Sequence, residues 1–257
     1  MIRCLTAVGM ILLAAVEANA APIFYGPSAY AQDSDSPFSG GSFDYFYLEN
    51  FEDGSFNTPG VSMSFTGATQ AVVTSPGEAI DSVDGDDGNL NGRGRQGHSL
   101  FLGGPDGATT VVTFTFDDSA PELLGQLPTS AGLVWTDSGR PNTGDVFGEP
   151  GYGFAIVSFE AFDALGISLG IIGPSNVGDG RTDGLTGEDR FFGAYNADGI
   201  SKIALTINSA DWEMDHLQYG GIRQQTPEVP EPSSMILALI GTIGGYTLKR
   251  RRTTATV

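Results

Sequence analysis

The chain has 257 residues, one cysteine and a net formal charge of −19 at pH 7. So negative a chain excludes binding to the phosphate backbone of nucleic acids, and a single cysteine excludes an intrachain disulfide framework. The 37 glycines are about twice the usual share, which is typical of a β protein with many turns.

The first 20 residues have the three parts of a secretory signal peptide. Arg3 supplies the basic start, residues 4–16 the apolar run, and Ala18-Asn19-Ala20 a small-x-small cleavage site. We therefore expect residues 1–20 to direct export and to be removed after Ala20, together with the only cysteine. Residues 21–42 are rich in Ser, Gly and Asp and are predicted to be a flexible lead-in.

Residues 43–223 are predicted to form one all-β domain. Short runs of alternating apolar and polar residues are separated by Gly, Asp, Asn and Pro, without βαβ alternation. This pattern predicts a β-sandwich of the jelly-roll type. The expected strands cover residues 43–52, 61–66, 70–74, 98–102, 109–117, 133–136, 152–162, 190–195, 203–207 and 212–219. Only residues 120–127 suggest a short helix.

Alternation also predicts which side chains face the core. Val112 and Phe114 alternate with threonines and are expected to point inward. Phe154 and Ile156 are expected to share one face of the run 152–162.

Acidic side chains dominate the part of the chain between the two ends. Residues 21–248 hold 30 acidic and seven basic side chains, a net charge of −23. Self-repulsion keeps such a body soluble, and divalent cations would relieve it. A solvated acidic surface without a specific partner is the equal alternative.

The segment 81–92 is a candidate Ca²⁺ loop, because Ca²⁺ takes six to eight oxygen ligands. Read from Asp87 it matches the first half of an EF-hand loop, but His98 stands where the bidentate glutamate belongs. A looser calcium loop and a turn that caps backbone groups are the two alternatives. The candidate ligands are Asp84, Asp86, Asp87, Asn89 and Asn91.

Catalytic motifs are weak, and we expect no enzyme. Gly97-His98-Ser99-Leu100-Phe101 begins like a nucleophile elbow, but Phe101 stands where glycine is required. His98 and His216 are the only histidines, so a histidine-based triad is poorly supplied. Both are expected to be hydrogen-bonded strand residues.

Aromatic rings could form a platform for sugar, because planar rings stack on the C–H faces of sugars. The candidate ligand-binding residues are Trp135, Trp212 and Tyr219. Packing in the core is the alternative for each of them.

The last residues combine three unlike features in a fixed order. Val229-Pro230-Glu231-Pro232 precedes an apolar run at 235–248, and the basic stop Lys249-Arg250-Arg251-Arg252 follows. The 14-residue run would make a helix of roughly 21 Å, shorter than the bilayer core of about 30 Å. The cations should stay cytoplasmic, which leaves the body outside. Residues 224–231 are the expected linker.

This tail, residues 229–252, resembles the PEP-CTERM sorting signal of bacterial exported proteins. The resemblance implies recognition by an exosortase, a membrane-embedded sortase-like protease. It also implies transient anchoring by the C-terminal helix, followed by a cell-surface or extracellular location. An ordinary single-pass anchor is the alternative.

Six short segments resemble the ectodomain of a recurrent group of PEP-CTERM proteins of uncharacterised function. They are SVDG at 82–85, GHSLF at 97–101, GLVWTD at 132–137, FEAFD at 159–163, EDRFFG at 188–193 and DHLQYG at 215–220. The group is distantly similar to jelly-roll carbohydrate-binding modules, a fold-level analogy.

That analogy suggests a second Ca²⁺ position, between an acid near the first strand and one in the last. Glu52 and Asp215 occupy comparable places in this chain. If 212–219 is a strand, Asp215 shares a face with Leu217, and a carboxylate there needs a cation or hydrogen-bond donors. Arg190 or a backbone amide could serve instead of a metal.

The leading hypothesis is an exported, non-catalytic protein of the cell surface or extracellular matrix, associated with exopolysaccharide. The alternative is a Ca²⁺-stabilised carbohydrate-binding module. The third is a hydrolase or lyase that acts on polysaccharide.

Calcium provides a test. If either group of carboxylates holds a structural ion, a chelator should lower the melting temperature, because binding of the ion is linked to folding. Thermal denaturation with and without EDTA measures the shift, and restoring Ca²⁺ is the control. An unchanged melting temperature would remove the calcium hypothesis.

Overall fold

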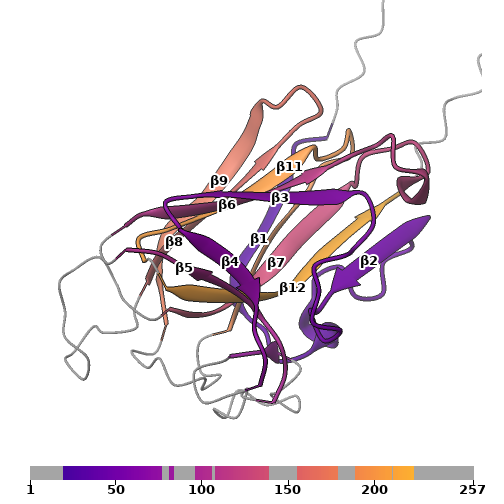
Figure 1. Cartoon of the computed structure of the whole chain (residues 1–257). Helices are drawn as coiled ribbons and strands as arrows, with labels where there is room; N and C mark the ends of the chain where they lie inside the picture. Colours follow the sequence, from indigo (N-terminus) through magenta and orange to yellow (C-terminus); the bar gives the residue numbers. More distant parts are fainter. Residues whose placement is uncertain are drawn as a thin grey trace, which may run out of the picture. The chain divides into compact units, whose positions relative to one another are not determined.

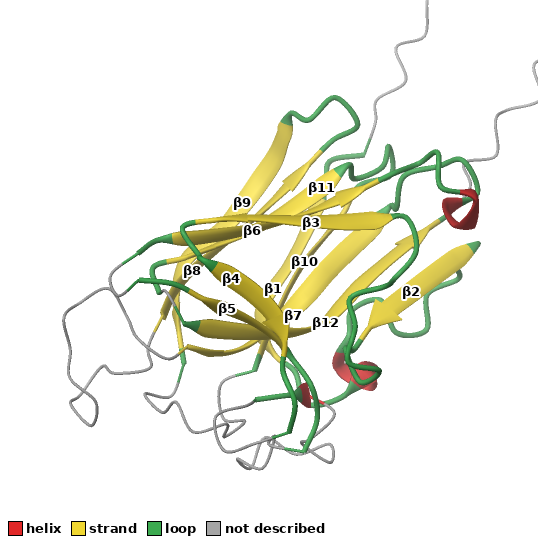
Figure 2. Cartoon of the chain, in the orientation of Figure 1, coloured by secondary structure: helices red, strands yellow, loops and turns green. Residues whose placement is uncertain are grey.

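The computed structural model describes residues 20–76, 81–83, 96–105, 108–138, 155–178, 189–209 and 211–222. Within them two antiparallel β-sheets lie face to face (Figure 1), and strands account for nearly all the regular structure (Figure 2). The fold class is therefore all-β, a sandwich of two sheets, as the sequence predicts. The chain divides after Ile222, and the remainder lies outside the described residues.

The larger sheet has seven strands in the order β1-β10-β7-β12-β5-β4, with β2 paired to β12. Their bounds are β1 Ile23–Ala29, β2 Tyr45–Glu49, β4 Gln70–Val73, β5 Leu100–Gly103, β7 Ser130–Ser138, β10 Arg190–Tyr195 and β12 Trp212–Gly221.

The smaller sheet has five strands in the order β3-β6-β11-β8-β9. They are β3 Val61–Thr66, β6 Thr110–Phe116, β8 Ala155–Phe162, β9 Ser168–Val177 and β11 Lys202–Ile207. Successive strands cross repeatedly from one sheet to the other, in keeping with the jelly-roll expectation. Two 3₁₀ turns, Asp33–Asp35 and Pro121–Leu123, complete the described elements.

The core lies between the two sheets and follows from alternation along the strands. Val112 and Phe114 of β6 are fully buried, as predicted. Phe114 opposes Met63 of β3 on one side and Ile203 of β11 on the other. Cross-strand pairs of this kind stabilise the sheet in addition to the area that they bury.

Strand β12 is buried along all ten residues, so both of its faces are covered. Met214 and Leu217 both belong to the core between the sheets, although they are three positions apart and regular alternation would place them on opposite faces. The change of register occurs at an irregularity between Asp215 and Gln218, where His216 has the positive φ of 45°. A bulge of this kind switches the face that later side chains occupy.

The bulge corrects the expectation that Asp215 shares a face with Leu217. Leu217 packs in the core, whereas Asp215 contacts Ser82 and Val83, and Val83 belongs to a second, smaller apolar cluster. Plain alternation could not reveal the extra residue.

The predicted flexible lead-in is also wrong. Residues 23–29 form β1, which pairs with β10, and Tyr30 and Phe38 are buried beyond it. Burial of these two rings explains why a segment rich in Ser, Gly and Asp is ordered.

Three further expectations differ from the structure. Strand β9 is not among the predicted strands, because it is a mostly exposed edge strand with glycine and proline. In β8 the inward residues include Val157 and Phe159, so the face predicted for Ile156 points away from the core; Phe154 lies outside the described residues. The expected helix at 120–127 is only a 3₁₀ turn, which Leu124 ends in the left-handed conformation.

Replacing Phe114 by alanine should destabilise the protein by about 3–5 kcal/mol, because it leaves a cavity at a fully buried site. Phe65, on the neighbouring β3, is 37% exposed. Its replacement by alanine is the matched control and should cost less than about 1 kcal/mol. Urea denaturation measures both, and equal losses would contradict the described core.

Candidate functional site

The face of the seven-stranded sheet that points away from the core, called here the outer face, carries polar side chains of β12. Glu213, Asp215, His216 and Gln218 are all nearly or fully buried. Such groups must find partners, because burying a polar or charged group without them is costly. Two segments distant in sequence supply them, residues 30–43 and residues 81–83.

Glu213 is a nearly fully buried acid of this face. Its Oε2 accepts hydrogen bonds from the backbone N–H of Asp81 at 2.8 Å and from the hydroxyl of Ser99 at 2.7 Å. Burial, reinforced by the charges of Asp137 and Asp215, nevertheless raises the pKa of Glu213 to about 8. The side chain therefore holds a proton near neutral pH.

Asp215 is held by donors from three residues. Its Oδ2 accepts hydrogen bonds from the hydroxyl of Ser82 at 3.1 Å and the N–H of Val83 at 3.0 Å, and its Oδ1 accepts one from the N–H of His216 at 2.7 Å. Backbone amides thus donate hydrogen bonds to this carboxylate. Such amides are one of the alternatives to a metal ion that the sequence left open.

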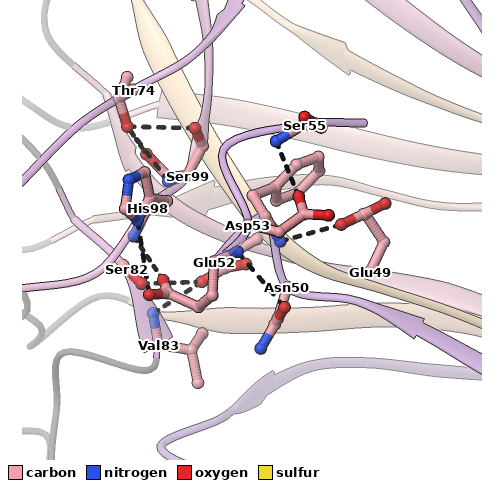
Figure 3. A network of polar contacts seen from close by, with 12 residues as sticks. Glu49, Asn50, Glu52, Asp53, Ser55, Thr74, Ser82, Val83, His98 and Ser99 are labelled. Carbon is pink, nitrogen blue, oxygen red and sulfur yellow. Dashed lines mark hydrogen bonds and ion pairs between the residues drawn. The ribbon is translucent and has the colours of Figure 1, made fainter. Parts of the chain in front are cut away.

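Glu52 lies near Ser82 and Val83 of the segment 81–83 (Figure 3). Its Oε1 accepts the N–H of His98 at 2.5 Å, and its Oε2 lies 3.4 Å from His98 Nδ1. A Cβ on Gly97 would collide with both Ser82 and Glu52, so only glycine allows this approach. Asp215 contacts Ser82, and Ser82 and Glu52 both lie next to Gly97; a metal between the two acids stays a prediction.

The other candidate ligands, Asp84, Asp86, Asp87, Asn89 and Asn91, lie outside the described residues. Within the described ranges, no group of three or more His, Cys, Asp or Glu side chains is arranged to hold a metal ion.

The candidate sugar platform is corrected by the structure. Trp135, Trp212 and Tyr219 are at most 1% exposed and pack in the core. The indole N–H of Trp212 donates to the hydroxyl of Thr110 at 2.6 Å, and the hydroxyl of Tyr219 donates to the carbonyl of Pro59. No ring face of the three is open to a ligand.

A cavity of about 340 Å³ opens on the outer face, between residues 30–43 and β2. Phe43 and Phe46 provide apolar surface, and Asp33, Ser36 and Gln218 provide polar groups. This combination of rings and a few converging polar groups is typical of small-molecule sites.

Buried hydrogen bonds hold the inner wall of the cavity. Gln218 Nε2 donates to the hydroxyl oxygen of Tyr30 at 2.7 Å, and the hydroxyl of Ser36 donates to Gln218 Oε1 at 2.5 Å. His216 Nδ1 lies 3.1 Å from Tyr30 Oη and 3.2 Å from Asp33 Oδ1. Contact with His216 lowers the pKa of Asp33, and burial raises the pKa of Tyr30.

Sequence reasoning missed the residues of this cavity. The rings of Phe43 and Phe46 both fall in the expected strand 43–52, of which the structure forms only Tyr45–Glu49. Phe43 therefore precedes the strand, and nothing in the spacing shows that Phe46 points outward. The only sign in the sequence is that two large rings, Tyr30 and Phe38, lie within a segment of mostly small and polar residues. Rings of this size indicate that part of the segment is buried.

Comparisons with known proteins identify the sorting signal of the chain and do not bear on this cavity. Residues 228–252 are a PEP-CTERM protein-sorting motif. The sequence-based identification of the tail is confirmed, and the motif supports an exported, envelope-associated protein that an exosortase sorts. No curated protein is significantly similar in sequence.

One solved structure was found to be similar, the family 11 carbohydrate-binding module of the cellulosomal cellulase Lic26A-Cel5E of Clostridium thermocellum. It is 11% identical, with 70% of this chain and 98% of that module covered, and the TM-score is 0.23. At so low a score the likeness carries no argument about ligand or activity.

The membrane-related segments lie outside the described residues. These are the signal peptide through residue 19, the linker, the apolar run 235–248 and the basic stop. Among the residues that the structure does describe, no helix is both long and apolar enough to span a membrane.

Replacing Glu213 by glutamine should flatten the dependence of stability on pH. A carboxyl whose pKa rises from 4.5 to about 8 on folding stabilises the fold fully below pH 4.5, and this contribution is lost as the pH rises to about 8. The loss can reach a few kcal/mol, at about 1.4 kcal/mol per pKa unit. Glutamine cannot ionise, and its amide oxygen can still accept both hydrogen bonds.

The free energy of unfolding in urea, measured from about pH 5 to about pH 8.5, checks this. It should fall more steeply with pH in the wild type than in Glu213→Gln. Glu122→Gln removes an exposed carboxyl as the control and should keep the wild-type slope. A Glu213→Gln protein with that same slope would contradict the assignment.

Proposed function

We propose that the protein is an exported, non-catalytic component of the cell surface or extracellular matrix, associated with exopolysaccharide. The observation that carries the proposal is the PEP-CTERM protein-sorting motif at residues 228–252. The tail holds the protein in the membrane until an exosortase processes it, and the folded body then remains outside.

The chemistry of the tail supports transient anchoring. Pro230 and Pro232 disfavour a helix and keep the approach to the membrane extended and open to a protease. The apolar run that follows is short for a permanent span. The four cations after it oppose its translocation.

The surroundings of the two histidines support a non-catalytic body. His216 is 1% exposed and contacts Tyr30 and Asp33. His98 is engaged with Glu52 through both its N–H and its ring. Neither histidine is among the residues that line the cavity on the outer face.

A carbohydrate-binding module is the second candidate, and the cavity with its exposed Phe46 ring favours it. In that form the protein would bind the polysaccharide directly, and a structural Ca²⁺ could stabilise the segment around Ser82. The two candidates share export and sorting and differ in whether the body itself recognises sugar.

Replacing Glu231 by alanine should prevent processing, because it removes the charge between the two prolines of the motif. We expect the variant to accumulate in the membrane fraction with its tail intact, and the wild type to appear outside with a shortened C-terminus. Mass spectrometry of the C-terminal peptide from both fractions measures this.

Glu122→Ala, which removes an exposed glutamate of the folded body, is the control and should be processed normally. A Glu231→Ala protein that reaches the surface with the wild-type C-terminus would overturn the proposed sorting.

A further inference from the structure

The cavity on the outer face has an aromatic side that is open to solvent. Phe46 is 40% exposed, and its ring centroid lies 5.2 Å from that of Phe43 at an interplanar angle of 32°. The two rings thus form a nearly continuous apolar surface. A pair of rings held at the mouth of a cavity offers a stacking surface for a planar or ring-shaped ligand.

A glycine on the neighbouring strand makes room for this ring pair. Gly220 of β12 pairs with Phe46, and a Cβ at this position would lie 2.8 Å from the Phe46 ring and 2.9 Å from the Phe43 ring. It would also lie 2.9 Å from the carbonyl oxygen of Tyr45, which cannot rotate away. The rings therefore lie directly on the sheet.

The opposite wall carries groups that can bind hydroxyls. The Asp33 side chain is 70% exposed, and one of its oxygens contacts His216, which orients the carboxylate. The Ser36 hydroxyl and the Gln218 amide are held by each other and by Tyr30. Polar groups positioned before the ligand arrives lose little conformational entropy when it binds.

Size and polarity together favour a sugar. The volume of about 340 Å³ is at the small end of the range for ligand sites, about 300–1,000 Å³. An extended acyl chain would place apolar atoms against the exposed carboxylate of Asp33, which is costly for a charged group. A sugar ring presents a C–H face to the phenylalanines and hydroxyls to the polar wall.

Charge limits the class of sugar. The lining includes the acid Asp33 and no lysine or arginine, and the sequence has no lysine or arginine between Arg3 and Arg93. An acidic polysaccharide would meet a carboxylate in the cavity and, around it, a body whose residues 21–223 carry a net charge of −21. Repulsion between like charges disfavours such a ligand, most strongly at low ionic strength.

We propose that this cavity binds a residue of a neutral polysaccharide, stacked on Phe43 and Phe46 and hydrogen-bonded to Asp33, Ser36 and Gln218. The inference rests on the second of the two proposed functions, in which the body itself binds the exopolysaccharide, and it adds the site and the class of sugar.

Titration calorimetry of the purified full-length protein tests the proposal. The probes are hexasaccharides of glucose, mannose and galactose, with hexagalacturonate as the acidic counterpart. At least one neutral hexasaccharide should bind, and Phe46→Ala should weaken it by about tenfold, as expected for an aromatic anchor. Asp33→Ala should weaken it as well.

Phe65→Ala is the matched control. It removes a phenylalanine of nearly equal exposure from β3, in the other sheet, and should bind as the wild type does. Melting temperatures of all variants show whether each is folded. Should Phe46→Ala fail to fold, Asp33→Ala, which changes an exposed side chain, decides alone.

Three results would overturn the proposal. The first is that no neutral hexasaccharide binds. The second is that Phe46→Ala or Asp33→Ala binds the sugar as tightly as the control Phe65→Ala does. The third is that hexagalacturonate binds as tightly as the neutral sugars. None of these three results bears on export and sorting, because Phe46→Ala should still be exported and processed. Failure of the sorting experiment, in turn, leaves the calorimetry unaffected.

Discussion

The burial of β12 on both faces is the constraint on which the rest of the structure depends. One face completes the apolar core with Trp212, Met214 and Leu217. The other bears Glu213, Asp215 and Gln218, whose polar atoms lose water in the folded state. Stability therefore requires hydrogen-bond partners over the outer face, and these come from residues 30–36 and 81–83. A segment that resembles a linker by composition is thus an integral part of the sandwich.

The same constraint explains how so acidic a protein accommodates buried carboxyl groups. Asp215 receives backbone and hydroxyl donors, a pattern that stabilises the charged form. Glu213 also receives two donors, but burial and its neighbours Asp137 and Asp215 outweigh them, and its pKa rises to about 8. Two acids that lie two residues apart on β12 are thus buried in different ways. Asp215 is surrounded by hydrogen-bond donors, and Glu213 keeps its proton.

The sequence predicted the parts of the molecule that depend on local pattern. Alternation located β3 and β10 to the residue and placed Val112 and Phe114 in the core, because a half-buried strand repeats every two residues. It failed where a long-range contact decides the outcome. The bulge at His216 moved Asp215 to the outer face, and burial of Tyr30 ordered the supposed lead-in. The cavity was not predictable for the same reason, since its lining joins residues 30–48 to Gln218 across most of the chain.

The uneven distribution of basic residues connects the fold to the proposed ligand. The N-terminal third contributes nearly every residue that lines the cavity, and after Arg3 it contains no lysine or arginine before position 93. Whatever binds there must be recognised by rings, hydroxyls, an amide and one carboxylate, without a cation. Of the twelve basic residues of the chain, seven lie from Arg93 to Arg223 and four form the basic stop at 249–252. None of those seven lines the cavity, and this local absence of cations favours a neutral ligand over an acidic one.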